Sequence, residues 1–159
     1  NSMLRAIGVT QLPGWLSSQE WALPTVAMMS IWTGMGYCIV VDMAALQGIP
    51  DELYESAKID GANVFQSFFH ITVPLISPTT FFLMLIKIIG TFQVFGPIKL
   101  MTQGGPGRST TVVVYQIYRE AFQYYKIGYA SALTLVLFVI IMLVTLLQMK
   151  LQKKWVYQY

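Results

Sequence analysis

The apolar residues of this chain are gathered into long runs instead of being dispersed as in a water-soluble domain. Residues 21–41 and 127–149 contain no charged side chain, and within residues 61–86 the only ionisable side chain is that of His70. A helix of about 20 residues crosses a hydrocarbon layer of about 30 Å. The pattern therefore predicts an all-α, polytopic membrane protein with three transmembrane helices, over residues 22–46, 74–98 and 127–149.

The polar segment 47–73, between the first two predicted spans, is expected to contain two short helices. Pro50 and the acidic residues that follow it favour a helix start, and Gly61 favours its end. A second helix is predicted over residues 62–70 and is expected to be broken at Pro74. Both helices carry apolar faces, which either pack back on the membrane domain or fill a groove on a partner protein.

Composition and charge agree with a membrane environment. Hydrophobic residues make up 55% of the chain and charged residues 11%, with a mean hydropathy of +0.58. A soluble domain has about 25% charged residues. The net charge of +3 is scattered. The basic residues near the C-terminus are accompanied by aromatic ones, which is typical of a membrane-interface anchor and not of a nucleic-acid patch.

The side chains that catalysis or metal binding requires are scarce. The chain has one His and one Cys, and most of its carboxylates lie in the segment 47–73. Cys38 lies in the first predicted span and is expected to be an apolar filler. The Gly-rich stretch 104–107 lacks the Gly-Lys-Ser/Thr ending of a nucleotide-binding loop. No catalytic residue, cofactor or metal ligand is therefore predicted.

The segment 47–73 also carries a motif with a definite spacing. Glu-Ser-Ala at 55–57 is followed after three residues by Gly61, and after nine more by Ile-Thr-Val-Pro at 71–74. This motif resembles the Glu-Ala-Ala signature of permease subunits in binding-protein-dependent ABC importers. Two positions, Ser56 and Val73, depart conservatively from that signature.

Other stretches are similar to the carbohydrate-uptake importers, in particular to the first maltose-type permease subunit and the glycerol-3-phosphate permeases. These stretches are residues 46–55, 59–62, 92–95 and 101–106 with 109–110. The resemblance covers essentially the whole chain. It implies the C-terminal half of a six-helix-type permease core in the cell inner (cytoplasmic) membrane.

The resemblance also implies an orientation, which the balanced positive charges leave open. Residues 47–73 would be the cytoplasmic coupling loop with its coupling helix, and residues 150–159 a cytoplasmic tail. Residues 1–21 would form an external loop. Residues 99–126 would form an external Gly-Gly-Pro loop and an interfacial helix.

Two sets of site residues follow from the same resemblance. The residues that would couple the permease to an ATPase are Glu55, Ser56, Ala57, Gly61, Ile71 and Pro74. The residues that would line the substrate pathway are Thr33, Gly34, Tyr37, Lys87, Gly90, Thr91 and Val94. The last four are spaced by three, four and seven residues, which predicts one helical face.

The implied function is translocation of a sugar or sugar derivative by alternating access, with ATP hydrolysis in a partner protein. The implied partners are a second permease subunit, ABC ATPase subunits, an extracytoplasmic solute-binding protein, the sugar and the lipid bilayer; no nucleic acid is expected. Two alternatives stay open. One is a permease for glycerol-3-phosphate or another polyol or phosphodiester, and the other is a truncated remnant that does not transport.

Lys87 is an unusual residue for the interior of a predicted span. A lysine there is costly and marks a solute pathway or a partner. Either Lys87 faces the solute cavity, or it snorkels to the interface or forms a structural ion pair, for example with a preceding half of the protein. In the first case the sequence favours an anionic solute such as a sugar phosphate.

Overall fold

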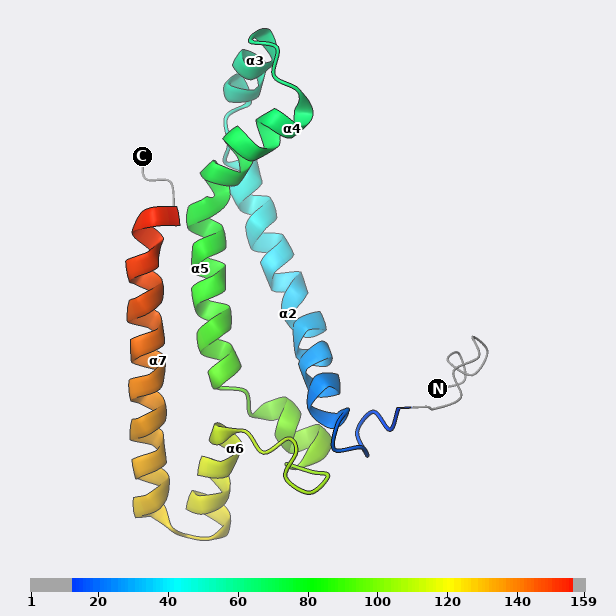
Figure 1. Cartoon of the computed structure of the whole chain (residues 1–159), viewed down its shortest axis with the longest axis vertical. Helices are drawn as coiled ribbons and strands as arrows, with labels where there is room; N and C mark the ends of the chain where they lie inside the picture. Colours follow the sequence, from blue (N-terminus) through cyan, green and yellow to red (C-terminus); the bar gives the residue numbers. More distant parts are fainter. Residues whose placement is uncertain (1–12, 156–159) are drawn as a thin grey trace. The chain divides into compact units, whose positions relative to one another are not determined.

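The computed structural model describes residues 13–155 (Figure 1). Parts of the expected external loop 1–21 and of the expected tail 150–159 therefore lie outside the described residues. The helices are α2 (Ala22–Gln47), α3 (Asp51–Ile59), α4 (Val64–Ser67), α5 (Val73–Phe92), α6 (Val113–Tyr118) and α7 (Ile127–Trp155). Three short π-helical segments connect them: η1 (Phe68–Thr72), η2 (Ile98–Thr102) and η3 (Arg119–Gln123).

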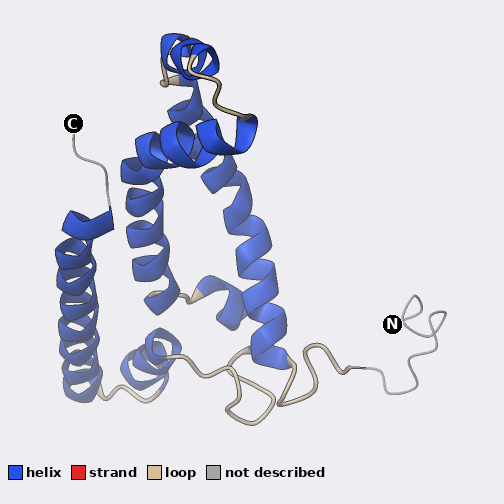
Figure 2. Cartoon of the chain, turned by 45° about the horizontal axis from the view of Figure 1, so that its top comes forward, coloured by secondary structure: helices blue, strands red, loops and turns tan. Residues whose placement is uncertain are grey.

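The predicted all-α class is confirmed, because residues 13–155 contain helices, turns and bends but no strand (Figure 2). Within this range three helices are long and apolar enough to cross a membrane, namely Ala22–Gln47, Val64–Phe92 and Ile127–Gln152. Their large apolar side chains are widely exposed; Trp32 of α2, for example, is 76% exposed. Such a surface is unfavourable in water and suits contact with lipid.

The helix break expected at Pro74 is wrong. The segments α4, η1 and α5 follow one another without an interruption, and only the direction of the helix changes between α4 and α5 (Figure 1). The π-helical turn η1 lies directly before the proline, with the Val73 N–H bonded to the Phe68 carbonyl. This wider turn changes the hydrogen-bond pairing where the proline nitrogen has no hydrogen to donate, so the helix continues.

A second proline is accommodated inside α5. Pro78 has no N–H for the carbonyl of Pro74, which lies four residues earlier. The Ser77 hydroxyl instead donates to that carbonyl oxygen at 2.7 Å. The side chain thus replaces the missing backbone donor, which a helix in lipid requires.

Two helix ends differ from the predicted spans. The second span was expected to reach residue 98, but α5 ends at Phe92 and a new helical segment begins near Pro97, where a residue without an N–H is favourable. Val94 therefore lies beyond α5 and does not share a helical face with Lys87. The third span was expected to end at residue 149, but α7 continues to Trp155.

The chain divides into two compact units, which are described separately. One unit comprises residues up to 33 together with 92–139, and the other comprises residues 34–91 together with 140 onward. The first unit has a small apolar core formed by Val26, Ile98 and Tyr115. The partly buried side chains Val94, Phe95, Met101, Val112 and Tyr118 pack against this core.

The Gly-Gly-Pro loop of the first unit is closed by its own hydrogen bonds. The buried Thr110 hydroxyl lies 2.7 Å from the Thr102 hydroxyl and donates to the Gly105 carbonyl at 2.9 Å. The Tyr115 hydroxyl donates to the Gln103 carbonyl at 2.9 Å. The loop is therefore an ordered element that is continuous with the core of this unit.

Gly104 is a position in this loop where a side chain would be strained. Its φ is +86°, and an added Cβ would lie 2.8 Å from a ring carbon of Tyr115. We expect Gly104→Ala to lower the free energy of unfolding of the intact subunit by about 1–3 kcal/mol, because both the backbone conformation and the contact become strained. Denaturant titration in detergent micelles measures this change.

Gly128→Ala is the matched control, because an added Cβ at Gly128 meets no atom within 4 Å. Equal stabilities of the two variants would contradict the account of the loop.

Candidate functional site

The first candidate site is the segment between α2 and α5, which starts with a well-terminated helix. Asp51 and Glu52 lie in the first turn of α3, where the positive end of the helix dipole favours them. At the other end Gly61 has a φ of +80°. The Gly61 N–H bonds to the Lys58 carbonyl at 3.2 Å and the Ala62 N–H bonds to the Ala57 carbonyl at 2.9 Å. This pairing is a Schellman motif, which explains the glycine at this position of the sequence motif.

The next helix starts directly after that turn. Asn63 accepts a hydrogen bond from the Gln66 N–H at 2.9 Å, and the Gln66 side chain accepts one from the Asn63 N–H at 2.8 Å. This reciprocal capping box fixes the start of α4. The Tyr54 hydroxyl lies 2.8 Å from the buried Thr72 hydroxyl and so joins α3 to η1. We call α3 and the helical stretch formed by α4 and η1 the two arms of the segment. The two arms are therefore held together by their own side chains.

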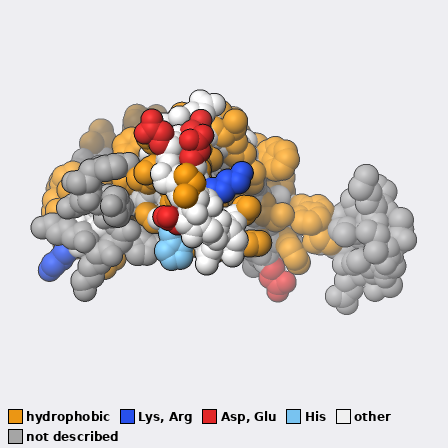
Figure 3. Space-filling model, turned by 90° about the horizontal axis from the view of Figure 1, so that it is seen from above, with side chains coloured by type: hydrophobic (Ala, Val, Ile, Leu, Met, Phe, Trp, Pro, Cys, Tyr) orange, Lys and Arg blue, Asp and Glu red, His pale blue; other side chains and the backbone are white. Residues whose placement is uncertain are grey.

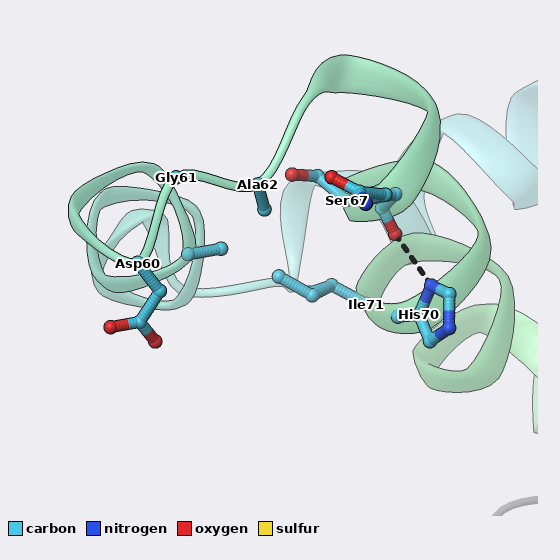
Figure 4. Close-up of a pocket in the computed structure, with 8 residues that line it drawn as sticks. Asp60, Gly61, Ala62, Ser67, His70 and Ile71 are labelled. Carbon is cyan, nitrogen blue, oxygen red and sulfur yellow. Dashed lines mark hydrogen bonds between the residues drawn. The ribbon is translucent and has the colours of Figure 1, made fainter.

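A hollow of about 400 Å³ lies between the two arms. Asp60, Gly61 and Ala62 border it at the turn, and Ile71 extends into it from η1 (Figure 4). His70 also borders the hollow, with its Nδ1 3.0 Å from the Gln66 carbonyl oxygen. In residues 13–155 no group of three His, Cys, Asp or Glu side chains is arranged to hold a metal ion.

The outer surface of this segment combines acidic and large apolar side chains. Figure 3 looks onto it and shows acidic side chains gathered together, with hydrophobic side chains exposed beside them. Four apolar side chains are more than half exposed and define what we call the apolar rim: Ile59 (86%), Val64 (83%), Phe65 (76%) and Phe69 (62%). Nothing in the described part of the chain covers the apolar rim.

The motif residues occupy different places in this arrangement. Ala57, Gly61 and Ile71 border the hollow together. Glu55 and Ser56 are exposed on α3, and Pro74 is half-buried at the start of α5. The spacing of the motif thus places three of its residues around one hollow between the two arms. The Glu55 carboxylate lies on the outer surface.

The second candidate site surrounds Lys87 on α5. Its Nζ donates a hydrogen bond to the Gly34 carbonyl of α2 at 3.0 Å and lies 5.4 Å from the centre of the Tyr37 ring. An added Cβ at Gly34 would lie 2.9 Å from this Nζ, so the missing side chain permits the approach. Gly34 and Tyr37 are three residues apart and share a face of α2.

The other residues of the predicted pathway are placed as follows. Gly90 and Thr91 lie one turn after Lys87 on α5, and the Thr91 hydroxyl donates to the Lys87 carbonyl at 2.9 Å. Thr33 precedes Gly34 on α2, and its hydroxyl donates to the carbonyls of its own helix. Thr33 and Val94 belong to the first unit, where Val94 packs against the apolar core. The structure thus brings Gly34, Tyr37 and Lys87 together.

Sequence reasoning missed the contacts that organise the first site. The Asn63 and Gln66 pair had a readable signal, because Asn followed three residues later by Gln is a capping-box pattern. The pairing of Tyr54 with Thr72 had no such signal, since the two residues are 18 apart and lie on different helices.

The comparisons with known proteins agree with one another. The model of the family described as binding-protein-dependent transport system inner membrane component matches residues 3–157. The probable ABC transporter permease protein YurN of Bacillus subtilis is 40% identical over 154 residues, which are 96% of this chain and 53% of YurN. The arabinooligosaccharides transport system permease protein AraP of the same organism is 34% identical over 152 residues, which are 95% of this chain and 48% of AraP.

A solved structure is also similar. The crystal structure of a bacterial alginate ABC transporter in complex with an alginate pentasaccharide-bound periplasmic protein contains a chain with a TM-score of 0.84 and 30% identity. The match covers 97% of this chain and 54% of that chain. This chain spans about half the length of the curated relatives it matches.

The bond between Tyr54 and Thr72 predicts a local effect. We expect Tyr54→Phe to lower the free energy of local opening by about 1 kcal/mol, because one hydrogen bond between the arms is lost. Hydrogen–deuterium exchange of the intact subunit should then be faster in residues 51–60. Tyr129→Phe serves as the control, since Tyr129 is exposed and its hydroxyl makes no hydrogen bond within residues 13–155. Unchanged exchange in Tyr54→Phe would show that this bond does not hold the arms together.

Proposed function

The chain belongs to the family of binding-protein-dependent transport system inner membrane components, and from this premise we propose that it forms membrane-spanning helices of an ABC importer. The importer carries a sugar or sugar derivative across the cytoplasmic membrane. The relatives support this substrate class, since AraP is described as an arabinooligosaccharide permease and the similar structure as an alginate transporter. ATP hydrolysis resides in the partner subunits and not in this chain.

The observation that carries this proposal is the uncovered apolar rim on a segment that is otherwise well ordered. Large apolar side chains exposed to water are unfavourable, and here they stand on helices fixed by capping hydrogen bonds. A preorganised helical surface loses little conformational freedom when it binds a groove. We infer that the segment between α2 and α5 faces the cytoplasm and docks into a cleft of an ATPase subunit.

The motif residues have distinct roles in this docking. Gly61 ends α3 so that the second arm can return beside it, and Ala57 and Ile71 border the hollow between the arms. Glu55 is exposed on α3 and is available for an ion pair with the ATPase. Because α4, η1 and α5 are continuous, a displacement of the docked segment is passed directly into a membrane helix.

Movement of this helix links ATP hydrolysis to solute access. Closure of the paired ATPase subunits displaces the docked segment, and α5 then shifts relative to its neighbours between inward-facing and outward-facing states. Solute passes beside Gly34, Tyr37 and Lys87, which provide an aromatic ring and an ammonium within the membrane-length helices. Gly90 and Thr91 continue this pathway along α5, and Thr33 and Val94 belong to the same proposed pathway.

Glu55→Lys tests the docking. We expect this change to weaken the binding of the ATPase subunits about tenfold, because an exposed carboxylate at the interface becomes a cation. Co-purification of the intact subunit with its partner permease and ATPases measures the assembly, and ATP hydrolysis stimulated by solute-loaded binding protein measures the coupling. Glu20→Lys is the matched control, since Glu20 is also an exposed carboxylate but precedes α2. Assembly and stimulation that are unaffected by Glu55→Lys would exclude this docking mode.

A further inference from the structure

The ammonium of Lys87 meets α2 at the middle of that helix. Gly34, which accepts its hydrogen bond, is the thirteenth of the 26 residues of α2. With a rise of about 1.5 Å per residue, this carbonyl lies about 18 Å from either end of the helix. A snorkelling lysine places its ammonium at a helix end, next to the headgroups. The Lys87 ammonium instead contacts α2 at the middle of that helix, while Lys87 itself lies five residues before the end of α5.

This charge has no anion beside it in the described residues. Within residues 13–155 the contacts of the Lys87 ammonium are one carbonyl oxygen and one aromatic ring. An ammonium has three N–H donors, so two of them remain for another group. A cation inside a spanning segment is costly unless it has polar partners, and an anion is the partner that offsets its charge directly. The two remaining donors suit a negatively charged group.

The surroundings of the ammonium suit a saccharide. The Tyr37 ring is half exposed, and its hydroxyl makes no hydrogen bond to any described residue. An added Cβ at Gly90, one turn along α5 from Lys87, meets no atom within 4 Å. A cation, an aromatic ring with an available hydroxyl and an open glycine surface thus lie next to each other. Sites for small polar ligands combine aromatic surface with a few charged or polar groups in this way.

We propose that Lys87 binds the acidic group of the solute, so that the transported saccharide or polyol carries a carboxylate, sulfonate or phosphate. This inference rests on the proposed importer function and names its substrate class. The Lys87 ammonium binds the acidic group, Gly34 holds the ammonium at mid-helix, and the Tyr37 ring contacts the carbon face of the sugar. A carboxylate of the second permease subunit, or of a further segment of this subunit, is the competing partner for Lys87. It is less suited to the site, because a structural ion pair needs neither the open surface at Gly90 nor an available Tyr37 hydroxyl.

The first experiment measures access to Lys87 in the assembled importer. The intact subunit, its partner permease and the ATPases are placed in lipid nanodiscs and treated with formaldehyde and a reducing agent. Mass spectrometry then follows methylation of Lys87 and of Lys150. The acidic probes are glucuronate, trigalacturonate and sn-glycerol 3-phosphate, and their neutral counterparts are glucose, galactotriose and glycerol.

We expect Lys87 to be methylated and at least one acidic probe to protect it about tenfold better than its neutral counterpart, as the loss of a hydrogen-bonded charge pair implies. Methylation of Lys150, which lies near the end of α7, should not respond to any probe. Lys87 that is unreactive in the assembled importer, or protected equally by acidic and neutral probes, or protected by none of them, overturns the proposal.

Variants supply the second test. ATP hydrolysis driven by binding protein loaded with the protecting probe should fall about tenfold in Lys87→Met and much less in Lys87→Arg, which keeps the charge. Lys150→Met should behave as the wild type. If Lys87→Met abolishes assembly, and removal of a carboxylate on the second permease subunit or on a further segment of this subunit restores it, the residue forms a structural ion pair and the proposal is wrong.

The failure of this inference is distinguishable from the failure of the importer function. An importer whose ATP hydrolysis responds to no solute-loaded binding protein contradicts the proposed function. An importer that responds equally to a neutral solute in the wild type and in Lys87→Met retains the proposed function and contradicts only the inference about Lys87.

Discussion

Polar groups inside a hydrocarbon layer have to find their partners within the protein, and the described helices are organised around this requirement. Pro78 deprives a carbonyl in α5 of its backbone donor, and the neighbouring Ser77 hydroxyl replaces that donor. Other hydroxyls in the apolar helices donate to carbonyls of their own helix, as in Thr25, Ser30, Thr33, Thr91 and Thr134. These hydroxyls thus form hydrogen bonds within their own helices, which present apolar side chains outward.

Lys87 differs from these hydroxyls because its hydrogen bond lies outside its own helix. Its ammonium reaches another helix, and it does so where Gly34 has no side chain to obstruct the approach. This contact therefore places a polar group between α2 and α5. The same contact that pairs the two helices supplies the charge around which the proposed solute pathway is arranged.

The segment between α2 and α5 is ordered in a different way. Its helix ends are closed by the left-handed Gly61 and by the capping box at Asn63, and Tyr54 bonds to Thr72 across its two arms. The segment is ordered without any contribution from the apolar rim, which stays exposed. Because the hydrogen bonds at the helix ends order the segment without the apolar rim, the rim is available to a partner while the helices that carry it are already formed.

The sequence by itself determined the class of fold and the two ends of α3. Long uncharged runs in lipid permit only helices, and Gly61 marks a helix end because of the backbone angle it adopts. Tertiary structure alone decided that α5 runs through Pro74 and ends at Phe92, and that Lys87 meets Gly34, 53 residues away. The physical reason is that periodicity along a chain assigns residues to faces of one helix. It does not specify which faces of different helices meet, or where a local π-helical turn allows a helix to continue past a proline.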